Sequence, residues 1–274
     1  MHKIKYSILF LLIFLMAGLF CAVQALKPLS LNTYVNPFIG TGGHGHTFPG
    51  ACLPFGMVQL SPDTRLEGWD GCSAYHGSDS VIYGFSHTHL SGTGCSDYGD
   101  ILVMPVSGPV NLKDYGYASS FSKKDEVATP GFYQVQLLKN KVKVELTATA
   151  RAGFHRYTYQ GSVPANIVID LKHRDKVLES GLKVTRDDEI EGFRVSRAWA
   201  SRQMIYFVAK FSRPFTSYSL ASGEQLSSVL QEVNGDNLKA VLTFSGARSP
   251  ITRSGKCGGR SADREESSST IATR

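Results

Sequence analysis

The sequence lacks the short motifs that mark several large enzyme classes. It has no GxSxG nucleophile elbow, no phosphate-binding P-loop and no dinucleotide-binding fingerprint. The run "GTGCSDYGD" is rich in glycine, but no helical pattern follows it, so it does not have the context of a phosphate-binding loop. The sequence therefore gives no support to hydrolases, nucleotide triphosphatases or dehydrogenases that depend on these motifs.

The sequence also lacks the concentrated positive charge that nucleic-acid binding requires. Its formal net charge is +6, but Lys3 and Lys5 lie in the first 25 residues, and residues 246–274 hold six basic against three acidic side chains. The body between these ends is almost neutral. We therefore expect no nucleic-acid partner.

Cysteine is scarce, and its spacing fits no metal-binding pattern. Of the five cysteines, Cys52, Cys72 and Cys95 lie in one short region that contains no CxxC pair. An exported compartment permits disulfides, so we expect one bridge and one free thiol in this region. The sequence does not fix the pairing, which could also involve Cys257.

The amino-terminal residues predict export. Basic residues precede an apolar run that ends at Cys21, and small residues follow up to Ala25, which is typical of a secretory signal peptide comprising residues 1–25. Attachment as a lipoprotein at Cys21 is a weaker alternative, because bulky Leu19 and Phe20 precede that cysteine. We expect a secreted or periplasmic protein that has no membrane contact after cleavage behind Ala25.

From residue 131 onward the pattern is that of β-strands. Apolar residues alternate with polar ones on both sides of a polar tip at residues 139–141, which predicts an antiparallel hairpin. Helical periodicity is almost absent, and further short strands are predicted over 154–159, 165–171, 192–199, 203–211 and 238–244. This pattern predicts an all-β fold, a large antiparallel β-sandwich or barrel, over residues 26–245. Residues 246–274 lack aromatic residues and aliphatic periodicity, so they are predicted to be a disordered tail.

The segment 36–109 differs in kind, because it is rich in Gly, Ser, His, Asp and Tyr. It contains two His-x-His pairs, His44 with His46 and His87 with His89. In an extended backbone, residues two apart project to the same side, so each pair could direct two imidazoles at one point. No third ligand stands at a recognisable spacing, and we assign no metal site to them from sequence.

The other candidates in this segment are acidic and aromatic side chains. Paired carboxylates are what acetal hydrolysis requires, but every aspartate here lies within two residues of Gly, Ser or Pro, where it commonly caps turns. Trp69, in "EGWDGCSAYH", offers a flat apolar face on which a sugar could stack, or it could anchor the loop. Trp199 alternates with polar residues in a predicted strand and is expected to be a buried anchor. The acidic residues of the segment are Asp63, Glu67, Asp70, Asp79, Asp97 and Asp100.

Three blocks of this segment resemble a known family. "YVNPFIGTGGHGHTFPGACLPFGMVQLSPDT", "GWDGCSAYH" and "IYGFSHTHLSGTGCSDYGDILVMP" are similar, in order and spacing, to the amino-terminal domain of glycoside hydrolase family 92, whose members are exo-acting α-mannosidases. The resemblance extends over about residues 33–245. It implies a β-sandwich that precedes an (α/α)6 barrel, with the active site between them, and inverting, calcium-assisted hydrolysis of mannose glycans, many of them α-1,2-linked.

In this family the acid, the base and most calcium ligands belong to the barrel. The resemblance therefore implies that no catalytic residue lies in this chain and that the sandwich loops line the sugar pocket. The substrate-binding candidates that follow from the matched blocks are Trp69, Asp70, His87, His89, His44, His46 and Asp97. We expect the partner barrel to be missing and residues 246–274 to result from a truncation or a frameshift.

Three functions compete at this level. The first is the pocket-forming domain of an α-mannosidase, inactive by itself. The second is a stand-alone carbohydrate-binding protein, for which Trp69 and the polar loops would suffice. The third is a metallohydrolase that uses both His-x-His pairs.

Overall fold

The computed structural model describes residues 30–223, 225–245 and 267–273. By its internal contacts the chain divides into the units Met1–Val35 and Asn36–Arg274. The described part of the first unit contains one 3-10 helix, η1 (Leu31–Tyr34), in which Thr33 donates its hydroxyl hydrogen to the carbonyl of Ser30 at 2.8 Å. The predicted signal peptide lies outside the described residues. Within the described ranges, no helix has the length and apolar character needed to cross a membrane.

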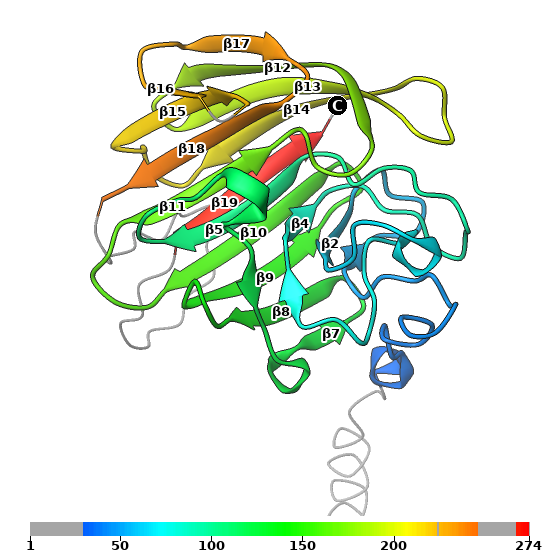
Figure 1. Cartoon of the computed structure of the whole chain (residues 1–274). Helices are drawn as coiled ribbons and strands as arrows, with labels where there is room; N and C mark the ends of the chain where they lie inside the picture. Colours follow the sequence, from blue (N-terminus) through cyan, green and yellow to red (C-terminus); the bar gives the residue numbers. More distant parts are fainter. Residues whose placement is uncertain (1–29, 224, 246–266, 274) are drawn as a thin grey trace, which may run out of the picture. The chain divides into compact units, whose positions relative to one another are not determined.

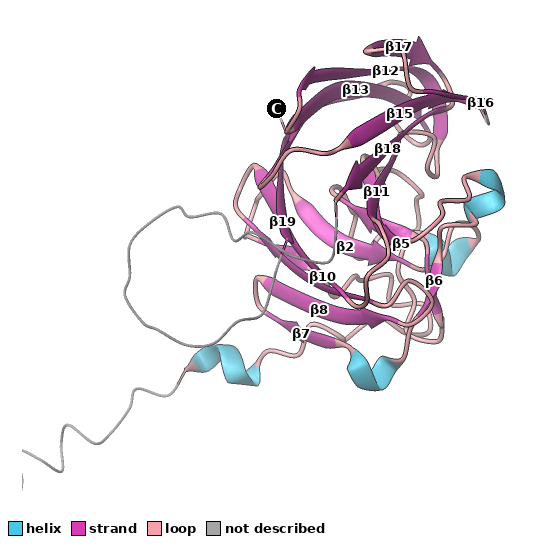
Figure 2. Ribbon diagram, turned by 90° about the vertical axis from the view of Figure 1, so that its left-hand side faces the viewer, coloured by secondary structure: helices cyan, strands magenta, loops and turns pink. Residues whose placement is uncertain are grey.

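The second unit contains an eight-stranded and a nine-stranded antiparallel sheet, and Figure 2 shows the larger sheet curving around the smaller. The smaller sheet has the strand order β1 (Ala51–Cys52), β2 (Gln59–Asp63), β4 (Gly84–Ser86), β5 (Leu102–Ser107), β11 (Ala165–Asp170), β18 (Leu238–Phe244), β15 (Ser217–Ser222) and β16 (Gln225–Ser227). The larger sheet has the order β17 (Glu232–Gly235), β12 (Lys176–Arg186), β13 (Glu189–Arg197), β14 (Gln203–Phe211), β19 (Ser267–Thr273), β10 (Ala152–Tyr159), β9 (Val142–Ala148), β8 (Phe132–Leu137) and β7 (Val127–Thr129). The predicted all-β sandwich is confirmed.

The remaining elements are short. The strands β3 (Val81–Ile82) and β6 (Ser119–Ser120) form a small separate ladder. The 3-10 helices η2 (Trp69–Gly71), η3 (Lys113–Tyr115) and η4 (Lys123–Asp125) lie in connecting loops. Because these helices have only three residues each, the loops that carry them are shaped by turns and side-chain contacts.

The core lies between the two sheets, and the alternation of the hairpin shows why. Tyr133, Val135 and Leu137 of β8 are fully buried while their neighbours are half-buried, and β9 repeats the pattern. Every second residue of a strand points to the same face, so these side chains meet the opposite sheet. Each large apolar side chain removed from water in this way contributes roughly 1.5–3 kcal/mol. The predicted hairpin with its tip at residues 139–141 is confirmed.

The strand β11 lies at the centre of the smaller sheet. All six of its residues are buried, and it pairs with β5 on one side and β18 on the other. A strand that is covered on both faces tolerates an almost continuous apolar run, which explains the sequence "ANIVID". The five later strands predicted from sequence all exist, but the one predicted over 192–199 ends at Arg197.

Two expectations are wrong. Residues 267–273 were expected to be disordered, yet they form β19, which pairs with β10 and β14 in the larger sheet. The backbone of these residues pairs with a strand on each side, and this pairing does not require an apolar pattern in the local sequence. Residues 246–266 lie outside the described ranges. The expected disulfide is absent from the described region, since Cys52, Cys72 and Cys95 are free; the thiol of Cys72 donates instead to the Trp69 carbonyl.

Candidate functional site

The loops that precede β5 gather beside β2 and β4 (Figure 1), and they carry most of the predicted site residues. The glycine-rich stretch 40–47 folds back on itself, with the Thr47 amide donating to the Gly40 carbonyl at 3.3 Å. At Gly45 a Cβ would stand 2.1 Å from the Gly40 oxygen, so no other residue fits without moving the backbone. His46 follows with a positive φ of 50°. The glycines therefore set the direction in which the two histidines point.

His44 and His46 converge on one carboxylate. The Nδ1 atom of His44 lies 2.7 Å from Asp70 Oδ1, and the Nε2 atom of His46 lies 3.4 Å from the same oxygen. The hydrogen bond from His44 is the main cause that holds the pKa of Asp70 below its ordinary value. His44 is largely exposed whereas His46 is buried. The predicted convergence of this His-x-His pair is confirmed, but a turn conformation produces it rather than an extended strand.

Trp69 begins η2 beside this cluster and remains 62% exposed. Its ring meets the His46 ring edge-on, with centroids 5.0 Å apart. At Gly94 a Cβ would stand 2.2 Å from the outer edge of the indole, so the indole lies directly against the backbone of a second loop. One edge of Trp69 is thus fixed while much of its surface stays open to solvent. This is an arrangement suited to stacking against a flat apolar ligand face.

The second His-x-His pair behaves differently. The Nδ1–H group of His87 donates to the Ile101 carbonyl at 2.7 Å, whereas His89 directs Nδ1 at the Gln59 carbonyl and Nε2 at Asp63. Both side chains are buried. They have separate partners and neither is accessible to a ligand in this chain. The two pairs therefore do not form one metal site, as a metallohydrolase using both would require.

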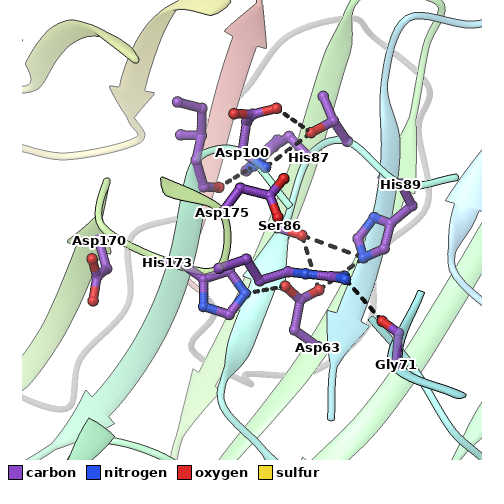
Figure 3. A network of polar contacts seen from close by, with 12 residues as sticks. Asp63, Gly71, Ser86, His87, His89, Asp100, Asp170, His173 and Asp175 are labelled. Atoms are coloured by element: carbon purple, nitrogen blue, oxygen red, sulfur yellow. Dashed lines mark hydrogen bonds and ion pairs between the residues drawn. The ribbon is translucent and has the colours of Figure 1, made fainter. Parts of the chain in front are cut away.

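A buried network surrounds Asp63 at the end of β2 (Figure 3). Its carboxylate accepts hydrogen bonds from Ser86, His89 and His173, with the Ser86 hydroxyl at 2.9 Å and His89 Nε2 at 2.8 Å. Burial alone would raise the pKa of Asp63, but the two histidines outweigh it and hold the pKa well below its ordinary value. Asp63 was expected to cap a turn, and that expectation is wrong. Its buried carboxylate instead links the segment of Ser86 and His89 to the segment of His173 through hydrogen bonds.

A second buried ion pair joins Asp100 to Arg194 of β13. The Thr88 hydroxyl donates to the other carboxylate oxygen at 2.8 Å. Arg194 also donates to the carbonyls of Leu171 and His173 at 2.9 and 2.8 Å. Satisfied in this way, the pair can be buried without leaving an uncompensated charge. Asp100, like Asp63, is therefore a structural anchor rather than a turn cap or an accessible acid.

A chain of neutral groups runs from Tyr157 to the carbonyl of Ile101. The Tyr157 hydroxyl donates to His155 Nδ1 at 2.8 Å, His155 Nε2 lies 3.0 Å from His87 Nε2, and His87 Nδ1–H donates to the carbonyl. Burial lowers the pKa of His87 to about 4, and it holds the pKa of His155 well below its ordinary value. Both imidazoles are therefore neutral near pH 7, as this hydrogen-bond order requires.

The sequence-based expectations missed Arg174, which lies near the candidate site, and misjudged Trp199. Arg174 donates to the Gly71 carbonyl at 2.8 Å and to the Ser96 hydroxyl at 2.9 Å, so it ties η2 to the loop before β5. Trp199 is 80% exposed, not a buried anchor as predicted, because it follows the end of β13. The neighbouring amide of Ala200 donates to Asp97 at 3.0 Å. The run "HRD" at residues 173–175, just beyond the strand predicted over 165–171, was the sequence feature that could have pointed to Arg174.

The predicted residues therefore separate into two groups. Trp69, His44, His46 and Asp70 form one cluster at the loop surface, which we call the His-Asp-Trp cluster. The other predicted residues, His87, His89 and Asp97, are buried and satisfied by protein partners. A hollow of about 510 Å³ lies elsewhere, on β12, β13, β14 and β17, and no predicted site residue lines it.

The donor set of the described residues does not suit calcium. The one group of potential metal ligands found among the described ranges is His44, His46 and Asp70. Calcium prefers six to eight oxygen ligands, whereas this group offers two imidazoles and one carboxylate. This group therefore does not have the oxygen-rich composition of a calcium site.

The fold and the loops define a class: an antiparallel β-sandwich domain that presents aromatic, imidazole and carboxylate groups on one loop surface. The family model of the glycosyl hydrolase family 92 N-terminal domain matches residues 34–253. The chain belongs to this family. Its resemblance to the family, expected from three short blocks, is thereby confirmed over most of the chain.

Solved structures and one curated protein are similar to this chain. The family GH92 alpha-mannosidase BT3965 from Bacteroides thetaiotaomicron, solved in complex with mannoimidazole, is 35% identical with a TM-score of 0.78 over 89% of this chain and 32% of its own. The inverting mannosidase BT2199 from the same organism, at 24% identity and a TM-score of 0.72 over 91% of this chain and 32% of its own, shares the fold. An uncharacterized secreted glycosidase from Arthroderma benhamiae is 30% identical over an alignment of 155 residues that covers 50% of this chain and 19% of that protein. The chain thus spans about a third of the solved relatives and a fifth of the curated one.

Proposed function

We propose that this chain is the pocket-forming amino-terminal domain of an exported α-mannosidase that acts on mannose glycans. The observation that carries the proposal is its likeness to the relative solved with mannoimidazole, at 35% identity over 89% of this chain. The chain contributes contact surface to the sugar and contributes no acid or base. Those groups belong to a partner domain, which we propose corresponds to the part of the relatives that this chain does not cover.

The geometry of the carboxylates supports a non-catalytic role. Inverting hydrolysis needs two carboxyl groups about 6.5–9.5 Å apart with room for water between them. In segment 36–109, Asp63 and Asp100 are fully buried in ion pairs and Asp97 is buried against a backbone amide. Asp70 is engaged by two histidines. None of these four carboxylates is free to activate water.

The His-Asp-Trp cluster is the part of the chain that we propose meets the sugar. Trp69 supplies a partly exposed ring that is held against Gly94, and stacking on its face would orient a mannose ring. His44 supplies an exposed imidazole and Asp70 a half-buried carboxylate at the edge of the same surface. An apolar face with polar groups at its rim is the usual composition of a sugar contact surface.

We further propose α-1,2-linked mannosides as the substrates and calcium as the cofactor of the complete enzyme. Both rest on family resemblance. The described residues offer no oxygen-rich ligand set, so the calcium ligands would lie in the partner domain. Export, through the predicted signal peptide, is consistent with the secreted relative.

The test is to incubate the purified chain with α-1,2-mannobiose, measuring mannose release and the heat of binding. We expect no release above the blank, and binding too weak to resolve without the partner domain. A mannose-releasing activity that co-purifies with the chain would overturn the proposal. The control is the Trp69→Ala variant, which should behave as the parent does in both measurements.

A stand-alone carbohydrate-binding protein is the second candidate. The observation in its favour is that Trp69 and Trp199 are both largely exposed on loops that Arg174, Ser96 and Asp97 connect by hydrogen bonds. In the same calorimetric experiment, saturable binding without turnover that is lost in Trp69→Ala would favour this candidate.

A further inference from the structure

We propose that His44, His46 and Asp70 form a binding site for a divalent transition metal, with zinc as its natural occupant. The proposal does not depend on the proposed function, because it concerns residues of this chain and a ligand that can be added alone. Nitrogen and oxygen atoms from the three side chains lie within 4.8 Å of one another. A ligand set of two imidazoles and one carboxylate suits zinc and its neighbours rather than calcium or magnesium.

The state of His46 is the first argument. Its Nδ1–H group donates to the Thr93 carbonyl at 2.6 Å. With the proton fixed on Nδ1, the lone pair of a neutral ring is on Nε2. A backbone carbonyl behind one ring nitrogen is the usual support of a histidine that binds metal through the other nitrogen.

The surroundings of that free nitrogen are the second argument. His46 Nε2 is buried and has no hydrogen-bond partner, although the side chain is only 5% exposed. A buried polar atom without a partner costs about 1–3 kcal/mol, and native proteins rarely keep one without a reason. Here the nitrogen points toward Asp70 Oδ1 at 3.4 Å without the alignment of a hydrogen bond.

That distance fits a shared metal ion. Zinc binds imidazole nitrogen and carboxylate oxygen at about 2.0–2.2 Å, which in a tetrahedron separates two ligand atoms by roughly 3.4 Å. His46 Nε2 and Asp70 Oδ1 thus already have the spacing of two zinc ligands. His44 Nδ1 is closer, at 2.7 Å from the same oxygen. Its side chain is 79% exposed, so it can move outward by a bond rotation when it exchanges its proton for the metal.

Three protein ligands leave one position of the tetrahedron open. Because His44 lies at the surface and Trp69 packs against His46, the open position would face solvent beside the indole. A water molecule or a ligand oxygen could occupy it. The loop 40–47, whose backbone turns at Gly45, would then be tied to η2 through the metal.

The test uses the full chain, stripped with a chelator and titrated with Co²⁺ as a spectroscopic probe, followed by displacement with Zn²⁺. We expect one equivalent of cobalt, a visible absorption spectrum of nitrogen and oxygen ligation, and displacement by zinc. The His46→Gln and Asp70→Asn variants should each weaken binding by at least the roughly 10- to 100-fold that loss of a supporting group costs. His44→Gln should weaken it too, and because His44 is exposed this variant should keep the fold of the parent.

The matched control is His76→Gln. His76 lies in the same loop region, but it bonds to the Ser78 hydroxyl and the Gly43 carbonyl instead of joining the cluster. The His76→Gln variant should therefore bind cobalt with the affinity of the parent chain. Far-UV circular dichroism of each variant separates lost ligation from lost folding.

Three results would overturn the site. The first is binding of less than one equivalent at micromolar metal. The second is a strong sulfur-to-cobalt charge-transfer band, which would assign the metal to Cys72 or Cys95. The third is an equal loss of affinity in His76→Gln and His44→Gln, which would mean that the ion binds surface histidines without regard to the cluster.

Discussion

The histidines of this chain meet very different surroundings, and surroundings decide their chemistry. His44 is exposed beside a carboxylate, His89 and His173 are buried against Asp63, and His155 is buried against another imidazole. Their positions in the sequence look alike, since His44 and His87 both begin a His-x-His pair. Only the fold separates a surface ligand from an interior hydrogen-bond partner.

The buried His87–His155 pair predicts a loss of stability in mild acid. The pKa of His87 is lowered to about 4 by burial, while in the unfolded chain it is about 6.5. As the pH falls through this window the unfolded chain gains protons that the folded chain does not, so stability is complete above about pH 6.5 and falls toward pH 4. For His87 alone the loss is on the order of 3 kcal/mol.

Urea unfolding at a series of pH values between 7.5 and 4.5 measures this effect. The His155→Gln variant should show a shallower decline, because it removes one of the two buried imidazoles whose pKa burial lowers. His76→Gln removes a half-buried histidine that does not belong to this pair, so this variant should keep the decline of the parent. An equally steep decline in His155→Gln would show that other groups cause it.

Gly45 gives a second prediction at this scale. Gly45→Ala places a methyl group 2.1 Å from the Gly40 oxygen, so the loop must open, at a cost of about 1–3 kcal/mol. Gly42→Ala is the matched control, because nothing lies within 4 Å of its Cβ position. Thermal unfolding of both variants should show a lower midpoint for Gly45→Ala alone; equal midpoints would contradict the described loop.

Part of the site could be predicted from residues alone. The close spacing of His44 and His46 among glycines was informative, because such a loop fixes both imidazoles near each other. Their partner Asp70 stands 24 residues beyond His46, and no periodicity connects such positions. Trp199 was misjudged because the strand was extended two residues too far, which reversed its expected burial.

At the scale of elements, the alternation of apolar and polar residues was sufficient to predict a strand wherever that strand has one buried face. The hairpin β8–β9 and the strands β10 and β14 follow such patterns. The strand β19 could not be predicted in this way, because it has little apolar content. What places it is the pair of free edges that β10 and β14 offer, and a partner's edge is not visible in local sequence.

The tip of the hairpin gives a prediction for an element. Asn140 was expected to be part of a polar turn, but it is buried, and its amide donates to the carbonyls of Pro105 and Tyr117 at 3.1 and 3.0 Å. Asn140→Ala leaves these carbonyls without that donor and should cost about 1–3 kcal/mol in the free energy of unfolding.

Lys141→Ala provides the comparison for Asn140→Ala. Lys141 is exposed, and the change keeps a non-glycine residue at its positive φ of 51°, so stability should stay within about 0.5 kcal/mol. Chemical denaturation of the two variants distinguishes them. If both cost the same, the hairpin tip would not be docked on β5 and the loop before β6.

At the scale of the whole molecule, the described strands form a sandwich with one apolar core and exposed aromatic side chains on its loops. Two sheets enclose one apolar core, and the family match extends over residues 34–253. Trp69, Trp199 and Phe55 are nevertheless largely exposed, and large exposed apolar side chains can mark a contact with a partner. Such a surface is consistent with a partner domain that covers it.

The most direct test of the central claim is mannose release from α-1,2-mannobiose by a fusion. In this fusion the chain replaces the corresponding domain of BT3965, the relative that it matches at 35% identity. We expect no activity for the chain alone, activity for the fusion, and a raised KM with little change in kcat when Trp69 is replaced by Ala in the fusion. Activity of the chain alone, or a folded fusion whose kinetics do not respond to Trp69→Ala, would contradict it.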